Sequence, residues 1–233
     1  MMHAAEQRDG TIVTFYSYKG GTGRTMALAN VAWILASAGK KVLVADWDLE
    51  APGLDRFFAP FLPISPVTNL HGVIDMVRAY EEHVSTETSD RSDGWLARLA
   101  SVRPHVVPLR WPFPDDGRLD LLTAGRQNGD YSASLAALDW DTFYERLGGA
   151  DFLDALRDGL RADYDYALID SRTGTVDLDQ HFVAGCAGMQ SLDVGRGDVF
   201  PHRFQTLGRG VMEEHGRLTT APLDDPCARV VVA

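Results

Sequence analysis

The feature that most constrains this chain is a strand, a glycine-rich loop, a helix and a second strand that follow one another within residues 11–45. Residues 11–16 (TIVTFY) are β-branched and aromatic, which predicts a strand. After the glycine-rich turn, residues 25–38 place apolar side chains at helical spacing up to Gly39, a residue type that commonly ends helices. Residues 41–45 (KVLVA) are almost wholly apolar, which is typical of a parallel strand covered on both faces. Such a unit has a right-handed crossover and predicts an α/β fold with a doubly wound, mostly parallel sheet.

Further elements are expected along the chain. Residues 119–123 (LDLLT) and 164–170 (YDYALID) are typical of strands, and the second of these ends in an acid. Residues 70–82 and 152–160 are expected to be helices. The remaining segments predict connections: a polar loop at residues 85–93 and an extended, proline-rich stretch at residues 103–118.

The last quarter of the chain differs from the rest. From about residue 178 hydrophobic periodicity is lost, and the one clear apolar run is residues 230–233. We therefore expect one domain over residues 1–177, with an irregular insertion around residues 56–118. Residues 178–233 are expected to be an atypical tail: a divergent ending, a truncation or, as we favour, the product of a reading-frame shift. The sheet is then expected to lack its later strands.

Composition narrows the class of protein. The 233 residues carry a net charge of −11, which argues against binding nucleic acid mainly through its phosphates, because that needs clustered Lys and Arg. The two cysteines are far apart in sequence and predict neither a disulfide framework nor a zinc site. We see no secretory signal and no apolar stretch that could anchor the chain in a membrane, so a cytoplasmic location is expected.

The loop between the first strand and helix has the composition of a phosphate-binding loop. Glycines allow the backbone to approach a ligand closely, and its N–H groups, with the positive end of the next helix, can hold phosphate oxygens. Thr25 supplies the first hydroxyl of the helix, which suits a Mg²⁺ ligand, and Arg24 stands where a lysine is usual. The expected nucleotide-binding residues of the loop are Lys19, Gly20, Gly21, Thr22, Gly23, Arg24 and Thr25.

The loop departs from the ordinary pattern G-x-x-x-x-G-K-[ST], since Tyr18 replaces the first glycine and Arg24 the lysine. It resembles instead the deviant Walker A motif, K-G-G-x-G-[KR]-[ST], of the ParA/MinD family of P-loop ATPases. The resemblance implies that Lys19 reaches across a homodimer interface to the partner's nucleotide. It also implies that Lys19 and Arg24 take part in catalysis.

Two other predicted strands end in carboxylates, at the edge of the sheet where ligands bind in such folds. The second strand leads into Asp46-Trp47-Asp48, which resembles the D-x-D motif of the same family, and residues 164–170 end at Asp170, which resembles its Walker B acid. By this resemblance Asp48 orients the attacking water, while Asp170 and Asp46 join Thr25 around Mg²⁺. Gly174 is expected to bring its backbone close to the terminal phosphate.

Two functions remain open from the sequence. The first is a slow Mg²⁺-dependent ATPase that dimerises around ATP and releases an unidentified protein partner on hydrolysis. The second is a regulatory module that senses the nucleotide without hydrolysing it. Arg24 bears on this choice, because a planar guanidinium holds phosphate differently from a compact ammonium.

Overall fold

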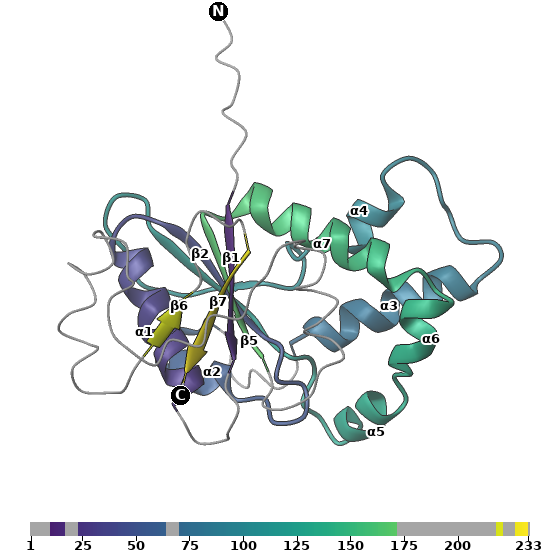
Figure 1. Ribbon diagram of the computed structural model, residues 1–233, viewed down its shortest axis with the longest axis horizontal. Coiled ribbons are helices and arrows are strands. Elements are labelled where there is room, and N and C mark those ends of the chain that lie inside the picture. Colours follow the sequence, from purple (N-terminus) through teal and green to yellow (C-terminus); the bar gives the residue numbers. More distant parts are fainter. Residues whose placement is uncertain (1–9, 17–22, 64–69, 172–217, 221–226, 233) are drawn as a thin grey trace, which may run out of the picture.

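A computed structural model describes residues 10–16, 23–63, 70–171, 218–220 and 227–232. Its centre is a seven-stranded sheet with the order β3-β4-β2-β5-β1-β7-β6 (Figure 1). The five inner strands are parallel to one another, and the short edge strands β3 and β6 pair with them in antiparallel orientation. The strands are β1 (Thr11–Tyr16), β2 (Lys41–Asp46), β3 (Val107–Pro108), β4 (Arg118–Leu122), β5 (Tyr166–Asp170), β6 (Leu218–Thr220) and β7 (Cys227–Val232).

Helices lie on both sides of this sheet, with α1 and α2 on one side and α3 to α7 on the other (Figure 1). The described helices are α1 (Arg24–Ser37), α2 (Leu54–Phe58), the 3-10 turn η1 (Ala59–Phe61), α3 (Val73–Ser85), α4 (Trp95–Leu99), α5 (Tyr131–Ala136), α6 (Trp140–Glu145) and α7 (Gly149–Asp163).

Strand β2 shows why both faces of the sheet are covered. Its apolar side chains alternate between two hydrophobic cores, because successive residues of a strand point to opposite faces. Val42 and Val44 join the core beneath α1, whereas Leu43 and Ala45 join the core beneath α3 and α7. All four are completely or almost completely buried. This arrangement confirms the predicted doubly wound, mostly parallel α/β fold.

The strand register brings the predicted acids to one edge. Strands β2 and β5 are neighbours, and Asp46 pairs with Asp170. On the other side of β5, Phe15 of β1 pairs with the same Asp170. The carboxyl ends of β1, β2 and β5 therefore meet, and the backbone N–H of Trp47 extends the pairing by donating to the carbonyl oxygen of Asp170 at 2.9 Å.

The described part of the tail contributes to the sheet. Strand β7 pairs in parallel with β1, and β6 pairs with β7 in antiparallel orientation. The apolar run at residues 230–233 thus lies mostly in β7. Residues 172–217 and 221–226 lie outside the described residues, so the expected boundary at residue 177 and the absence of later strands there stay predictions.

Candidate functional site

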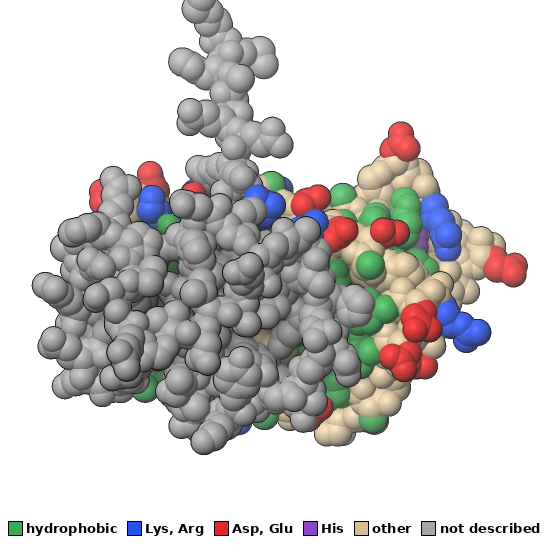
Figure 2. All heavy atoms as spheres, viewed as in Figure 1, with side chains coloured by type: hydrophobic (Ala, Val, Ile, Leu, Met, Phe, Trp, Pro, Cys, Tyr) green, Lys and Arg blue, Asp and Glu red, His purple; other side chains and the backbone are tan. Residues whose placement is uncertain are grey.

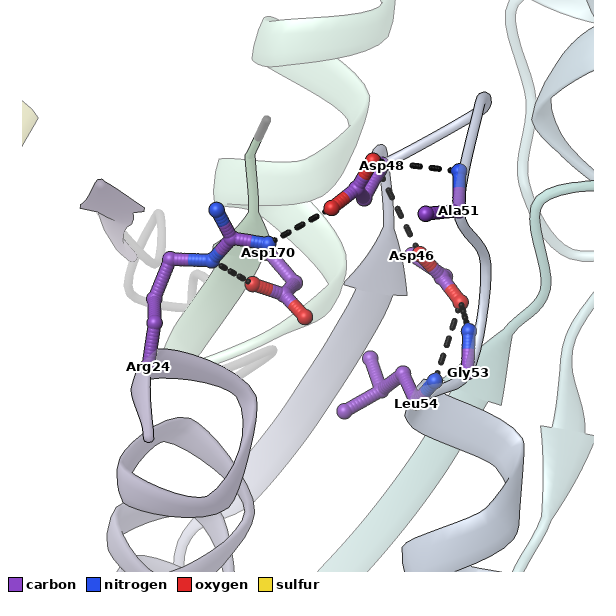
Figure 3. A network of polar contacts seen from close by, with 7 residues as sticks. All are labelled: Arg24, Asp46, Asp48, Ala51, Gly53, Leu54 and Asp170. Carbon is purple, nitrogen blue, oxygen red and sulfur yellow. Dashed lines mark hydrogen bonds and ion pairs between the residues drawn. The ribbon is translucent and has the colours of Figure 1, made fainter. Parts of the chain in front are cut away.

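Helix α1 begins where the predicted phosphate loop ends. Gly23 precedes it with φ of 81°, a left-handed conformation that favours glycine, and its carbonyl accepts the first helical hydrogen bond from Ala27 N–H at 2.9 Å. Arg24 is consequently the first helical residue. From there its side chain extends toward the ends of β2 and β5 (Figure 3).

Arg24 binds two acids that lie far from it in sequence. Its Nε donates to Asp170 Oδ1 at 2.5 Å, and one terminal nitrogen donates to Asp48 Oδ2 at 2.8 Å (Figure 3). The three side chains are largely removed from solvent, with exposed fractions of 8% for Arg24, 2% for Asp170 and 15% for Asp48. The other terminal nitrogen, Nη1, is buried and has no hydrogen-bond partner among the described residues. Within the described part of the chain, one cationic donor of this cluster is therefore left without an acceptor.

Burial and neighbouring charges shift the pKa values of Arg24 and Asp170 in opposite directions. Burial alone would lower the pKa of Arg24, but Asp170 and Asp48 together raise it, so the guanidinium stays charged. Burial raises the pKa of Asp170 above its ordinary value, although Arg24 and a hydrogen bond with the Thr25 side chain oppose that shift. Thr25 follows Arg24 in the first turn of α1, and its hydroxyl lies near enough to lower the pKa of Asp170, so the two expected metal ligands are neighbours.

The residues on either side of Asp48 set the direction of its side chain. Trp47 and Leu49 on either side are 5% and 4% exposed and pack into the core beneath α3 and α7, so Asp48 between them faces the other way, toward Arg24. Its second oxygen accepts from the backbone N–H of Ala51 at 3.3 Å. Each carboxylate oxygen of Asp48 therefore accepts one hydrogen bond from a described donor.

Asp46 has a different environment. Its Oδ2 accepts from the backbone N–H groups of Gly53 at 2.9 Å and Leu54 at 3.0 Å, and its Oδ1 accepts from that of Asp48 at 3.3 Å (Figure 3). Burial raises the pKa of Asp46 to about 7, with these backbone donors opposing the shift and the Asp170 carboxylate adding to it. Asp46 therefore shapes the loop between β2 and α2, and none of its described hydrogen bonds goes to Arg24.

The structure thus brings Arg24, Thr25, Asp48 and Asp170 into one cluster, with Asp46 beside it. The other predicted site residues, Lys19, Gly20, Gly21, Thr22 and Gly174, lie outside the described residues. Within the described ranges no group of three or more His, Cys, Asp or Glu side chains forms a metal site. The donor set nevertheless fits Mg²⁺ with a nucleotide, because this ion keeps several waters and commonly binds one or two carboxylates plus phosphate oxygens.

One residue near the cluster was not predicted from the sequence. Tyr131, the first residue of α5, donates its hydroxyl to the carbonyl oxygen of Leu49 at 2.7 Å. It belongs to no recognisable motif and is 82 residues from its acceptor. No sequence signal could have identified it.

The net charge of −11 argues against binding nucleic acid mainly through its phosphates. Acidic and basic side chains are interspersed over the visible parts of α4, α6 and α7 (Figure 2), and this face shows no continuous basic patch among the residues that the structure describes. None of the described helices is both long and apolar enough to cross a bilayer.

Comparisons with known proteins give partial similarities. No family model matches the sequence. An uncharacterized ATP-binding protein of Methanocaldococcus jannaschii is 44% identical over 45 residues, which is 19% of this chain and 17% of that protein.

Similar solved structures include ParA proteins and tyrosine kinase domains. A plasmid partition protein from Borrelia burgdorferi is 18% identical with a TM-score of 0.46, over 77% of this chain and 62% of that one. The pNOB8 ParA bound to nonspecific DNA is 19% identical with a TM-score of 0.43, over 75% and 50%. The kinase domain of the Escherichia coli tyrosine kinase ETK is 20% identical with a TM-score of 0.35, over 71% and 48%. The chain thus spans less than two thirds of the length of each of these relatives.

Proposed function

We propose that this protein binds ATP with Mg²⁺, hydrolyses it slowly and uses the nucleotide to control its dimerisation in the cytoplasm. The observation that carries the proposal is the convergence of Arg24 with Asp48 and Asp170 at the edge where three parallel strands end. A cation at a helix start, two acids on neighbouring strand ends and a hydroxyl beside one of them are the groups that phosphoryl transfer uses.

The charges of the cluster suit a polyphosphate. Arg24 keeps one buried donor, Nη1, without a partner among the described residues, and a charged donor of this kind favours an anionic oxygen. We assign phosphate binding to Arg24 together with Lys19, Gly20, Gly21, Thr22, Gly23 and the backbone of Gly174. Thr25 and Asp170 would hold Mg²⁺, with Asp46 supporting them from the adjacent strand end.

Asp48 is the proposed water-orienting residue. When bound, Mg·ATP supplies the electrophilic terminal phosphate and the metal that neutralises its charge. In the ion pairs with Arg24, both Asp48 oxygens are engaged. In the bound state we expect Arg24 to exchange its Asp48 contact for a phosphate oxygen, which leaves one carboxylate oxygen of Asp48 free to accept hydrogen bonds from water. This exchange is one reason to expect slow turnover.

Dimerisation is inferred from the loop sequence. It rests on Lys19, whose place in the K-G-G-x-G-R-T loop resembles a residue that reaches the partner's nucleotide in the ParA/MinD family. The short match to a protein described as ATP-binding supports the choice of nucleotide. The partner released on hydrolysis would be a protein.

A nucleotide sensor that does not hydrolyse is the second candidate. It is favoured by the ion pair between Arg24 and Asp48, which would keep Asp48 from water if it persisted in the bound state. Phosphate release separates the two candidates, since the sensor binds Mg·ATP without turnover.

Titration calorimetry with ATP, with Mg²⁺ and with a chelator, tests the binding, and a phosphate-release assay tests the turnover. We expect binding that depends on Mg²⁺, and turnover that falls about 100-fold in Asp48→Asn because general base or water-positioning groups commonly contribute that much. Asp158→Asn, at a side chain 73% exposed on α7, is the matched control and should keep wild-type turnover. Folded protein that takes up no Mg·ATP would refute the proposal.

A further inference from the structure

We infer that Tyr131 is a positioning residue for Asp48, holding the loop after β2 in the shape that presents this carboxylate. The inference rests on the proposed role of Asp48 and assigns to α5 a part in the same site. The link is one hydrogen bond, from the Tyr131 hydroxyl to the Leu49 carbonyl oxygen at 2.7 Å. It joins the first turn of α5 to the residue directly after Asp48.

The position of the Leu49 carbonyl explains how the hydrogen bond from Tyr131 affects Asp48. Leu49 is 4% exposed, so its side chain is anchored in the core, and the turn closes when Ala51 N–H donates to the Asp48 carbonyl at 3.2 Å. Tyr131 fixes the peptide plane between these two anchors. Loss of the hydroxyl would leave a largely buried carbonyl without that donor and let the plane rotate, which moves the backbone that carries the Asp48 side chain.

The donor is chemically suited to this role. Burial raises the pKa of Tyr131 above its usual range, and the carboxylates of Asp46, Asp48 and Asp75 raise it further. The phenol therefore keeps its proton at neutral and mildly alkaline pH and continues to donate. It is also a rigid side chain, so little conformational freedom is lost in forming the bond.

Contacts with residues outside the proposed nucleotide site hold Tyr131 in place. Its backbone N–H donates to the Asn128 carbonyl at 3.1 Å, and the segment before it is tied to α3 by the ion pair of Arg126 with Asp75 at 3.0 Å. Asp75 in turn accepts from the Gly72 backbone N–H at 3.0 Å, at the start of α3. A path of direct contacts thus runs from α3 through α5 to Asp48.

The experiment compares two tyrosine-to-phenylalanine variants in the full chain. Tyr131→Phe removes the hydroxyl at the loop. Tyr80→Phe is the matched control, because the Tyr80 hydroxyl also donates to backbone carbonyls, those of Leu147 at 2.6 Å and Gly148 at 3.0 Å, which lie between α6 and α7 and not in the loop after β2. Melting temperatures of both variants establish that they are folded.

Two readouts are expected to respond to Tyr131→Phe alone. Turnover of Mg·ATP should fall about tenfold, the factor expected for one lost positioning hydrogen bond, while the ATP affinity stays within about twofold. Hydrogen exchange should speed up in the peptide over residues 48–54 but not in β2. Faster exchange throughout the chain, or equal effects in Tyr80→Phe, would reduce Tyr131 to a packing residue and overturn the inference.

The exchange measurement also separates this inference from the proposed function. If the wild-type protein binds no Mg·ATP, or binds without turnover, the failure lies with the proposed function, and exchange over residues 48–54 still decides the link. If turnover and exchange are both unchanged in Tyr131→Phe, the positioning role is wrong even though the ATPase proposal stands.

Discussion

At the scale of single residues, Asp46 and Asp170 are two buried carboxylates paired side by side on neighbouring strands. Burying a charge is costly unless it is compensated, and each acid is compensated differently. Asp170 has an ion pair with Arg24, whereas Asp46 has three backbone N–H donors and no described cationic partner. The difference makes Asp46 the group whose protonation should change within the ordinary pH range.

We predict that Asp46 makes the unfolding free energy depend on pH. The unfolded chain loses this proton near the ordinary pKa of 3.8, whereas the folded protein keeps it up to about 7. Between those values the folded state binds more protons, so its stability falls as pH rises, by up to about 1.4 kcal/mol per pH unit. Asp170, whose pKa is also raised, acts in the same direction.

Asp46→Asn should flatten this slope, because the variant has no proton to lose at the position and keeps an oxygen that can accept from Gly53 and Leu54. Urea denaturation at about pH 5, 6, 7 and 8 measures the slope in both proteins. An unchanged slope would show that Asp46 does not titrate in this window.

At the scale of elements, two backbone hydrogen bonds fix the start of α3 against the residues that follow β4. Val73 N–H donates to the Thr123 carbonyl at 3.0 Å and Ile74 N–H to the Ala124 carbonyl at 2.9 Å. Two of the N–H groups that a helix start leaves unpaired are thereby satisfied. The approach is so close that a Cβ added at Gly72 would overlap the Thr123 carbonyl oxygen.

Gly72→Ala is therefore expected to push α3 away from β4 and lower the unfolding free energy by about 2 kcal/mol or more. Thermal or urea unfolding checks this value. Gly129→Ala is the matched control, since a Cβ there meets nothing within 4 Å, and it should change stability by less than about 0.5 kcal/mol. Similar losses in both variants would mean that close approach at Gly72 is not the cause.

At the scale of the whole molecule, the sheet joins both ends of the described chain. Strand β7 lies between β1, the first strand, and β6. Phe15 and Thr220 both pair with Val230, so the backbone of β7 is bordered on two sides. The short antiparallel strands β3 and β6 form the edges, which is how many sheets avoid pairing with other chains.

Val230→Pro should consequently destabilise the protein by about 2 kcal/mol, because proline removes an N–H from a strand with neighbours on both sides. Val230→Ala keeps the N–H and serves as the control for loss of the side chain. Urea denaturation compares the two, and exchange in β1 should increase in the proline variant only. Equal stability of the two variants would argue against β7 as an inner strand.

The regular part of the fold was predictable because its patterns are long and local. Residues 11–16 form β1 as predicted, residues 25–38 correspond to α1 within one residue, and the apolar run at residues 41–45 extends through Asp46 in β2. Helices α2, α4, α5 and α6 were missed. Each has five or six residues, too few for a helical period to show in the sequence.

The candidate site was predictable in its residue types but not in its contacts. Strand order places Asp46 beside Asp170, and the motifs had indicated both residues as candidates. Arg24 binds both acids, and Asp46 accepts hydrogen bonds from the loop backbone. These contacts depend on side-chain geometry, which the spacing of residues in the sequence does not determine. Tyr131 depends on tertiary packing alone.

The hydrogen bond from Trp47 N–H to the Asp170 carbonyl has a mechanical consequence. It continues the β2–β5 ladder past the last residue of β2, so both acid-bearing strand tips belong to one stiff frame. The guanidinium of Arg24 lies at the end of a long flexible side chain, so it is the group of the cluster that can move. A polyanion that binds here would meet carboxylates held in place by the sheet and a guanidinium that can exchange one anionic partner for another. Binding would then require a local exchange of ion pairs and no rearrangement of the backbone.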